Sequence, residues 1–246
     1  MGQGGTWVRE GQKIIEKPLK FAVMADVHSD WENFKKALEI AKSDNTEFLI
    51  IAGDLTTLGK RSELFDAKEI LDKSGLRYYV IPGNHDYWWS QRFNDKIFEE
   101  IFGEKYQSFK NGNVKFILID NGNADLGLGE TQKRWLEAEL KECLQFYCLV
   151  FAHIPFNHPT SLHVMGESSA SVASEAAELI RLFGQDEIKE IFAGHIHYSL
   201  SYEKEGLRTT IIVGAVTSNR NLQSPKFLEI SLVNGSLTKK ETFIAN

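Results

Sequence analysis

Seven aspartate, asparagine and histidine residues with metal-binding side chains stand at or just after the ends of short apolar segments: Asp26, His28, Asp54, Asn84, His153, His195 and His197. These segments predict buried strands. They span residues 20–25, 48–52, 78–82, 148–152 and 190–193. Because sites in open α/β folds lie at the carboxyl ends of strands, we expect the five strand ends to meet at one edge of a sheet and to bind metal.

Two pairs of these residues, Asp26 with His28 and His195 with His197, are two positions apart. In a strand such residues point to the same side, so each pair is expected to direct two ligands at one point. Carboxylate oxygen and imidazole nitrogen, without thiolate, favour manganese, iron, zinc, cobalt or nickel over calcium or a thiolate-bound structural zinc. The identity of the ion stays open.

Asp54 is the natural bridge between two cations, because the two oxygens of one carboxylate can bind ions roughly 3.5 to 4 Å apart. Two divalent ions would balance Asp26, Asp54 and one hydroxide and leave about one positive charge, which suits an anionic phosphate ester. Alone, His153 at a strand end or a Gly-Asp pair after a strand is explained by ordinary turn structure. Five such motifs in one order favour a two-metal site.

The elements that carry these residues alternate along the chain. Apolar residues at helical spacing predict helices over 30–43, 62–74, 131–144 and 171–183. Together with the strands they predict a layered α/β sandwich. The end of the chain predicts antiparallel strands, with a two-residue hairpin turn at Asn234-Gly235. Residues 1–18 are expected to form a flexible segment, and residues 19–246 a single domain.

Two long loops and the cysteines complete the expected architecture. Residues 121–130 and 157–170 are expected to form lids or substrate walls beside the site. Cys143 and Cys148 are expected to be free residues of the core, which favours a reducing compartment. No segment reaches the roughly 20 apolar residues of a membrane span, and the first twenty residues lack the apolar stretch of a signal peptide. We therefore expect a cytoplasmic protein without a membrane partner.

The charge of the chain limits its partners. Its 246 residues carry a formal net charge of −6, from 28 basic and 34 acidic side chains. This charge provides no general attraction to nucleic acid or anionic lipid, so an extended nucleic acid is not an expected partner. The sequence does not indicate the oligomeric state.

The motif order D-x-H, G-D, G-N-H-[DE], H and G-H-x-H, over residues 26–197, resembles that of calcineurin-like metallophosphoesterases. The resemblance implies a four-layer α/β/β/α sandwich, with two mixed β-sheets flanked by helices. It also implies two metal ions at the strand ends and in-line attack on phosphorus by a hydroxide that bridges them. By the family pattern one ion is bound by Asp26, His28, Asp54 and His197, and the other by Asp54, Asn84, His153 and His195.

The same resemblance makes His85 and Asp86 catalytic. His85 would stabilise or protonate the leaving-group oxygen, with Asp86 orienting it. Residues 53–57 lack the tyrosine of purple acid phosphatases and the arginine of protein Ser/Thr phosphatases. The chain looks most similar to the class III cyclic-nucleotide phosphodiesterase branch. We therefore expect a phosphodiesterase that acts on a small nucleotide-like phosphate ester. The alternatives are a phosphomonoesterase of the same fold, a nuclease and a non-catalytic scaffold.

Three further side chains are expected near the substrate. Trp88 can form a wall on which a base or an aromatic leaving group stacks, although packing over the sheet edge explains it equally well. His158, like His163, follows the candidate ligand His153 in the chain and can reach the phosphate. Arg220 follows an apolar strand and can contact an anionic substrate.

Overall fold

The computed structural model describes residues 18–93, 96–185, 188–204, 207 and 209–244. The expected flexible segment over 1–18 lies outside these residues, apart from Pro18. One sheet has the strand order β11-β10-β1-β2-β3, with the parallel strands β1, β2 and β3 at its centre and one edge. Its strands are β1 (Leu19–Met24), β2 (Phe48–Ala52), β3 (Arg77–Ile81), β10 (Lys226–Val233) and β11 (Ser236–Phe243).

The second sheet has the order β4-β5-β6-β7-β9-β8, in which the four inner strands are parallel and both edge strands antiparallel. Its strands are β4 (Gln107–Asn111), β5 (Val114–Leu118), β6 (Tyr147–Phe151), β7 (Ile188–Ala193), β8 (Leu200–Tyr202) and β9 (Thr209–Ile212). The five strand ends that precede the candidate ligands therefore belong to two sheets. The expectation of one sheet edge is wrong, because hydrophobic periodicity identifies a strand but not its neighbours.

Side chains that alternate between the two faces of each strand fill the space between the two sheets. In β1, Phe21 and Val23 face a core shared with the second sheet, whereas Ala22 and Met24 face the opposite side. Phe21 packs in this shared core against rings of both sheets, including Phe116 at 5.3 Å between ring centroids. The two sheets therefore pack face to face, which brings the carboxyl ends of their parallel strands together.

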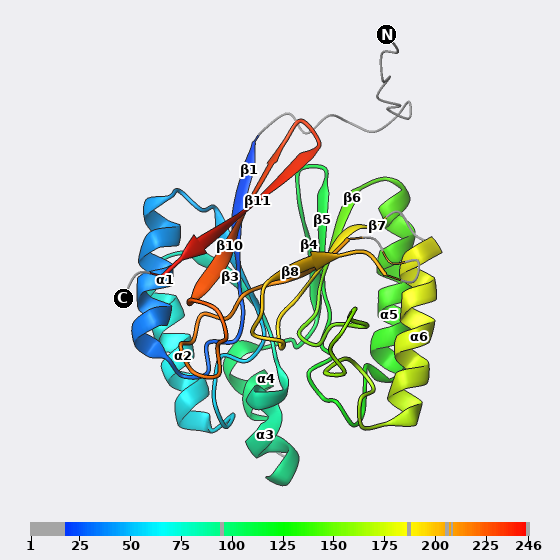
Figure 1. Cartoon of the computed structure of the whole chain (residues 1–246), viewed down its shortest axis with the longest axis horizontal. Helices are drawn as coiled ribbons and strands as arrows, with labels where there is room; N and C mark the ends of the chain where they lie inside the picture. The colour runs from blue at the N-terminus through cyan, green and yellow to red at the C-terminus, as the bar shows by residue number, and fades with distance from the viewer. Residues whose placement is uncertain (1–17, 94–95, 186–187, 205–206, 208, 245–246) are drawn as a thin grey trace.

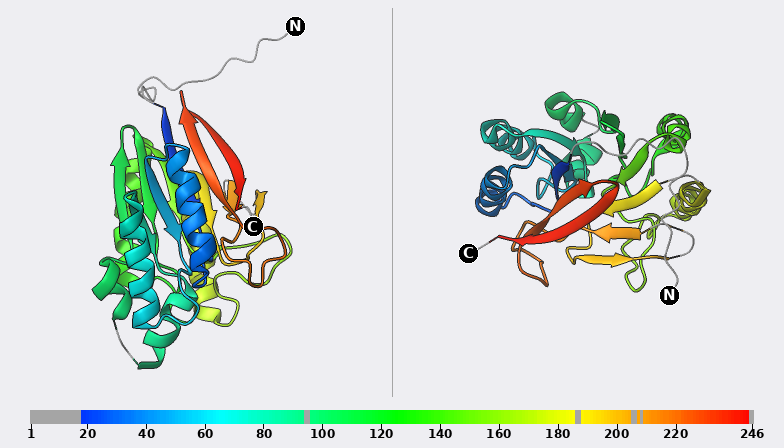
Figure 2. Two further views of the ribbon diagram at one scale, coloured as in Figure 1. Left: turned by 90° about the vertical axis from the view of Figure 1, so that its left-hand side faces the viewer. Right: turned by 90° about the horizontal axis from the view of Figure 1, so that it is seen from above.

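Helices cover the outer face of each sheet. The first sheet packs against α1 (Trp31–Ser43) and α2 (Arg61–Ser74), and the second against α5 (Gly129–Lys141) and α6 (Ala170–Gln185). Figure 1 shows the two helix pairs on opposite sides of the sheets, and the view from above in Figure 2 shows the layers end-on. The expected four-layer α/β/β/α sandwich with two mixed sheets is confirmed.

The predicted helix boundaries agree with local capping. The Asp30 side chain accepts a hydrogen bond from the backbone N–H of Asn33 at the start of α1, and Gly75, with φ of 72°, ends α2. The sequence did not predict the short helices α3 (Asn84–Phe93) and α4 (Ile97–Phe102). Helix α3 begins directly at the candidate ligand Asn84. The residues of its first turn belong to the candidate site, and the sequence there shows no capping pattern that would announce a helix.

The end of the chain returns to the first strand. β10 and β11 form the predicted antiparallel hairpin, and Asn234 and Gly235 at its turn have φ of 50° and 77°. β10 then pairs antiparallel with β1. β9 meets the expectation of antiparallel strands on one side only, because it pairs antiparallel with β8 but parallel with β7. Among the described residues, no helix combines the length and apolar character needed to cross a membrane.

The two cysteines do not remain free. Cys143, in the turn Glu142–Leu144 after α5, and Cys148, in β6, are both buried as expected, but their sulfur atoms form a disulfide. The turn between α5 and β6 brings their Cα atoms to 5.5 Å, which the spacing in the sequence does not reveal. The expectation of free thiols is wrong, and the two cysteines no longer favour a reducing compartment.

We expect Phe21→Ala to lower the free energy of unfolding by about 3–5 kcal/mol, because it leaves a cavity between the two sheets. Urea denaturation measures this change. The matched control is Phe65→Ala, since Phe65 lies on α2 with 61% of its surface exposed, and its change should stay within about 0.5 kcal/mol. Equal effects of the two substitutions would contradict the placement of the core.

Candidate dinuclear metal centre

The paired candidate ligands lie in loops after the strands, not within them. β1 ends at Met24, and the following Asp26 and His28 have φ of 55° and 47°. His195 and His197, after β7, have φ of 70° and 56°. Non-glycine residues rarely adopt this left-handed conformation, which stores backbone strain at functional sites. The expectation that strand alternation directs these pairs is wrong, because left-handed turns do so instead.

The first group of donor atoms comes from Asp26, His28 and His197, whose candidate ligand atoms all lie within 4.8 Å of one another. The Nε2 atoms of the two histidines are 2.9 Å apart, and Nε2 of His197 is 3.5 Å from Oδ1 of Asp26. Both oxygens of Asp26 also accept a hydrogen bond from the backbone N–H of His195, at 3.0 Å each. That contact fixes the loop after β1 against the loop after β7.

The second group consists of Asp54, His153 and His195, again within 4.8 Å. Nε2 of His153 is 3.3 Å from Oδ2 of Asp54 and 3.1 Å from Oδ1 of Asn84. Its Nδ1 lies 2.9 Å from the carbonyl oxygen of Ala52, a contact that orients the ring and leaves Nε2 for a metal.

Asp54 lies between the two groups. Its Oδ2 is 3.5 Å from Nε2 of His28 in the first group as well as 3.3 Å from His153 in the second. Its Oδ1 accepts a hydrogen bond of 2.8 Å from the backbone N–H of His85. This position is the one that a bridging carboxylate requires.

Two glycines of the motifs are needed because side chains pass close to them. A Cβ at Gly53 would lie 2.4 Å from Nδ1 of His153, and one at Gly83 would lie 2.1 Å from Oδ1 of Asp54. Gly53 also has φ of 88°. Gly53, before Asp54, and Gly83, before Asn84, therefore let the segments of the candidate ligands approach one another.

The electrostatics of the cluster fit divalent cations. Burial lowers the pKa of His28 and of His195 to about 3, so both rings are neutral and have a lone pair to donate. Burial would also lower the pKa of His153, but the adjacent Asp54 carboxylate raises it to about 9. Two fully buried carboxylates lie among these rings, and burial raises the pKa of Asp26. These oxygen and nitrogen donors suit the expected ions without selecting one.

His85 has a partner other than the expected one. Its Nδ1 lies 2.7 Å from the carbonyl oxygen of Thr57, and its ring centroid is 4.6 Å from that of His28. The Asp86 carboxylate instead accepts hydrogen bonds from the backbone N–H groups of Leu55, Thr56 and Gly83 and from the Thr56 hydroxyl. The expectation that Asp86 orients His85 directly is therefore corrected. Asp86 instead fixes the backbone of Leu55 and Thr56. The next residue, Thr57, contacts His85 through its carbonyl oxygen.

The three candidate substrate residues have different surroundings. Trp88 is 53% exposed, and its ring is 5.8 Å from that of His85 at an interplanar angle of 21°. His158 is buried, and its Nδ1 accepts hydrogen bonds from the backbone N–H groups of residues 160 and 161. Its ring packs against Tyr202. His158 therefore stabilises its own loop, whereas the ring centroid of His163 lies 6.4 Å from that of the candidate ligand His195.

Arg220 is exposed in the loop between β9 and β10. That loop is connected to the centre, because the backbone N–H of Thr217 donates a hydrogen bond to the carbonyl oxygen of Asp26 at 3.0 Å. This contact places Thr217, not Arg220, at the centre, so the expected contact of Arg220 with the substrate stays a prediction.

The sequence did not reveal the role of Asn121. Its side chain is buried and forms hydrogen bonds to the backbone of His153 and Ile154. The available signal was its place two residues after the apolar segment 116–119. That segment matches the pattern of the ligand-bearing strands, although the side chain after it turned out to bind backbone groups instead of joining the metal donors.

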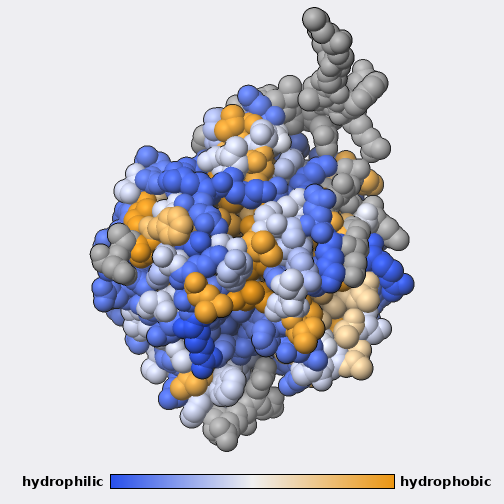
Figure 3. Space-filling view, in the orientation of Figure 1, coloured by the Kyte–Doolittle hydropathy of each residue, from blue (hydrophilic) through white to orange (hydrophobic). Residues whose placement is uncertain are grey.

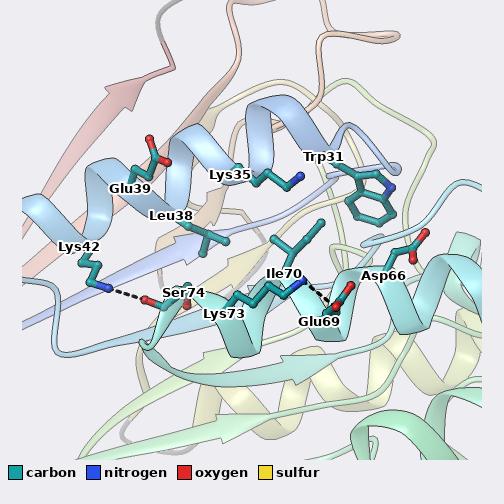
Figure 4. Close-up of a pocket in the computed structure, with 10 residues that line it drawn as sticks. All are labelled: Trp31, Lys35, Leu38, Glu39, Lys42, Asp66, Glu69, Ile70, Lys73 and Ser74. Atoms are coloured by element: carbon teal, nitrogen blue, oxygen red, sulfur yellow. Dashed lines mark hydrogen bonds and ion pairs between the residues drawn. The ribbon is translucent and has the colours of Figure 1, made fainter.

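A cavity of about 530 Å³ lies elsewhere, between α1 and α2 (Figure 4). Its ten lining residues include Trp31, Leu38 and Ile70 and none of the candidate ligands. Two of its lysines are engaged locally, Lys42 with the carbonyl oxygen of Ser74 and Lys73 with Glu69. The chemistry of the donor groups, rather than the size of a cavity, therefore identifies the functional site.

We expect removal of divalent cations with a chelator to lower the melting temperature, and Mn²⁺ to restore it. A ligand that binds only the native state stabilises it by roughly 2.7 kcal/mol at 100 times its Kd. Asp54→Asn should greatly reduce the shift, because both donor groups use this carboxylate. The control Asp66→Asn changes an exposed carboxylate on α2 and should retain the shift. Identical melting curves of the wild type with Mn²⁺ and with chelator would contradict a metal centre.

Comparison with known proteins shows which family the chain belongs to. The chain matches the family model described as calcineurin-like phosphoesterase over residues 19–199. It is 26% identical over 210 residues to a 3′,5′-cyclic-nucleotide phosphodiesterase of Nostoc sp., covering 77% of this chain and 76% of that protein. A probable glycerophosphodiester phosphodiesterase of Arcobacter nitrofigilis is 26% identical over 165 residues, covering 61% of this chain and 56% of that protein.

The solved structures agree on the fold. A dimetal phosphatase from Danio rerio superimposes with a TM-score of 0.70 at 16% identity, covering 93% of this chain and 97% of that one. The family match extends over most of the chain and includes the segments that carry every candidate ligand. This protein therefore belongs to the calcineurin-like phosphoesterase family and is a metal-dependent phosphoesterase.

Proposed function

We propose that this protein is a phosphodiesterase that uses two divalent metal ions to hydrolyse a small, nucleotide-like phosphodiester. The observation that carries the proposal is the position of Asp54 between two groups of donor atoms, with His85, which also lies within reach of His28 and Asp54, beside them. The names of the relatives from Nostoc sp. and Arcobacter nitrofigilis support a diester substrate over a monoester. The native metal is not part of the proposal.

The proposed ligands divide between the two ions as the family pattern implies. One ion is held by Asp26, His28, Asp54 and His197, and the other by Asp54, Asn84, His153 and His195. When bound, two such ions supply an activated water and neutralise charge on the phosphoryl oxygens. Asn84 adds a neutral amide oxygen. It completes the second donor set without lowering the net positive charge of the two bound ions. The chain's own residues then determine how the ester is held.

His85 is proposed to act on the leaving group. Its Nδ1–H donates to the Thr57 carbonyl oxygen, so Nε2 is the nitrogen left for the substrate. With both nitrogens protonated, Nε2–H can donate its proton to the departing ester oxygen. Thr57 is itself fixed, because its hydroxyl donates to the carbonyl oxygen of His28 at 2.7 Å. Ligand and proposed proton donor are thus held in one network.

Trp88 is proposed to contact the organic part of the substrate. More than half of its surface is exposed, and its ring lies nearly parallel to that of His85. A planar group attached to a phosphate at the metal ions would therefore meet an aromatic wall. Arg220 and His158 were also expected near the substrate. Of these two, we propose only Arg220 as a contact, because His158 is buried in its own loop.

The charge of the molecule favours a small substrate. Figure 3 shows hydrophilic side chains over much of one face, with separate hydrophobic patches scattered between them. With a net charge of −6, the protein would repel a long polyanion in general. A phosphomonoesterase is the second candidate, because the same donors can bind a monoester.

We expect protein reloaded with Mn²⁺ to cleave bis-p-nitrophenyl phosphate with a higher kcat/KM than p-nitrophenyl phosphate. Release of p-nitrophenolate measures both reactions. Asp54→Asn should abolish both activities, whereas the surface variant Asp66→Asn should match the wild type. A preference for the monoester would replace the proposal with the phosphomonoesterase. No turnover of either ester by the metal-loaded wild type would argue against this catalytic function.

We expect His85→Ala to reduce kcat for an alkyl leaving group far more than for p-nitrophenolate, because p-nitrophenolate departs with little protonation. Loss of a general acid typically lowers the rate by roughly 10²–10⁴-fold. Comparing p-nitrophenyl methyl phosphate with dimethyl phosphate measures the difference. The metal content of the variant, measured in parallel, should equal that of the wild type. Equal losses for both leaving groups would refute the proposed role of His85.

A further inference from the structure

The end of β5 provides no candidate ligand, yet its residues contact two segments that do. Asp120, Asn121 and Gly122 follow this strand and are all buried. Two of them carry polar side chains that the proposed reaction does not use. The loop that they begin was expected to form a lid or substrate wall, but their contacts point inward.

Asn121 contacts the segment of His153. β5 and β6 pair as parallel strands, and the backbone bond from the N–H of Ile119 to the carbonyl oxygen of Phe151 continues this pairing. Beyond it the side chain of Asn121 replaces the backbone ladder. Its Oδ1 accepts from the N–H groups of His153 and Ile154 at 2.9 and 3.0 Å, and its Nδ2 donates to the carbonyl oxygen of Ile154 at 2.6 Å. Three hydrogen bonds thus fix the backbone that bears His153.

The neighbouring residues contact the segment of Asn84. Gly122 packs against the backbone just before it, since a Cβ at Gly122 would lie 2.8 Å from the carbonyl oxygen of Pro82. Asp120 contacts the residues after it, because its Oδ2 accepts a hydrogen bond of 2.7 Å from the hydroxyl of Tyr87. Tyr87 is buried in the first turn of α3, the helix that begins at Asn84. The tripeptide therefore contacts the chain on both sides of Asn84.

These contacts connect two ligands that no strand pairing connects. Asn84 follows β3 in the first sheet, and His153 follows β6 in the second, yet Oδ1 of Asn84 and Nε2 of His153 are 3.1 Å apart. Metal affinity depends on ligand positions being held within about 0.5 Å. Residues that hydrogen-bond to the ligands or to their backbone therefore influence metal affinity, and their loss typically lowers this affinity roughly 10–100-fold.

We propose that the tripeptide Asp120–Asn121–Gly122 is a positioning element that sets the separation of Asn84 and His153, and with it the affinity for the ion that they share. The proposal rests on the ligand assignment of the proposed function. The tripeptide acts through the two ligands and does not itself touch the metal or the substrate. Its loss weakens the binding of one ion and leaves the binding of the other, held by Asp26, His28, Asp54 and His197, unchanged.

The test is Mn²⁺ binding to Asn121→Asp, measured by calorimetry and by the metal content after dialysis. Aspartate keeps an oxygen acceptor for the two N–H groups but replaces the Nδ2 donor that faces the carbonyl oxygen of Ile154. We expect two tightly bound ions per chain in the wild type and one in the variant, with the second weakened roughly 10–100-fold. The electron paramagnetic resonance signal of a coupled manganese pair should decline in parallel.

The matched control is Asn123→Asp, the same substitution two residues later in the same loop. Oδ1 of Asn123 accepts from the N–H groups of Asp125 and Leu126, both within this loop. This variant should retain both ions with wild-type affinity. Equal weakening in the two variants would overturn the proposal, since it would reflect the loop's general order rather than the contact with His153.

Two further variants keep the test decisive if Asn121→Asp does not fold, which circular dichroism of the metal-free protein would show. Tyr87→Phe removes only the hydroxyl that bonds to Asp120, and Gly122→Ala pushes on the backbone before Asn84. Both should weaken the same single ion. Two ions bound with wild-type affinity in the folded variants would overturn the inference and leave the proposed function intact. A wild type that binds no ions would instead refute the proposed function itself.

Discussion

The burial of two carboxylates beside four imidazole rings is the constraint on which the rest of the structure depends. Asp26 and Asp54 have almost no exposed surface, and charges in such positions are costly unless they are compensated. The chain itself compensates only in part, through backbone N–H groups and through His153, whose pKa is raised beside Asp54. Divalent cations bound by these side chains would complete the balance. The cluster is therefore built around positive charge that the side chains do not supply.

This constraint explains why strained backbone is gathered at the centre. Nine described non-glycine residues have positive φ, and five of them are candidate ligands: Asp26, His28, Asp54, His195 and His197. Each left-handed turn redirects the chain sharply after a strand, which allows several ligands to reach one point. Conformations of this kind persist only where the surroundings determine them. Here the two packed sheets and the hydrogen bonds between the loops provide that support.

The sequence was informative where the signal was local. Strand ends, helix caps at Asp30 and Gly75, the hairpin turn at Asn234-Gly235 and the candidate ligands could all be identified from neighbouring residues. Their partners across the fold could not. Hydrophobic periodicity did not show that the strands divide between two sheets, that Cys143 and Cys148 are bonded, or that Asp86 bonds to the backbone near Thr56 rather than to His85. Such contacts depend on tertiary packing, which brings together segments far apart in the sequence.

The division of the ligands between the sheets gives the metal ions a mechanical meaning. In the proposed assignment each ion takes ligands from loops of both sheets, so each is a non-covalent cross-link between the two halves of the sandwich. The aromatic core between the sheets, with Phe21, Phe116 and Phe151, then acts as a spacer that determines how far apart those loops stand. The packing of the interior and the distance between the two ions are therefore mechanically coupled. Substitutions in the spacer would consequently change the chemistry of a site whose residues they do not touch.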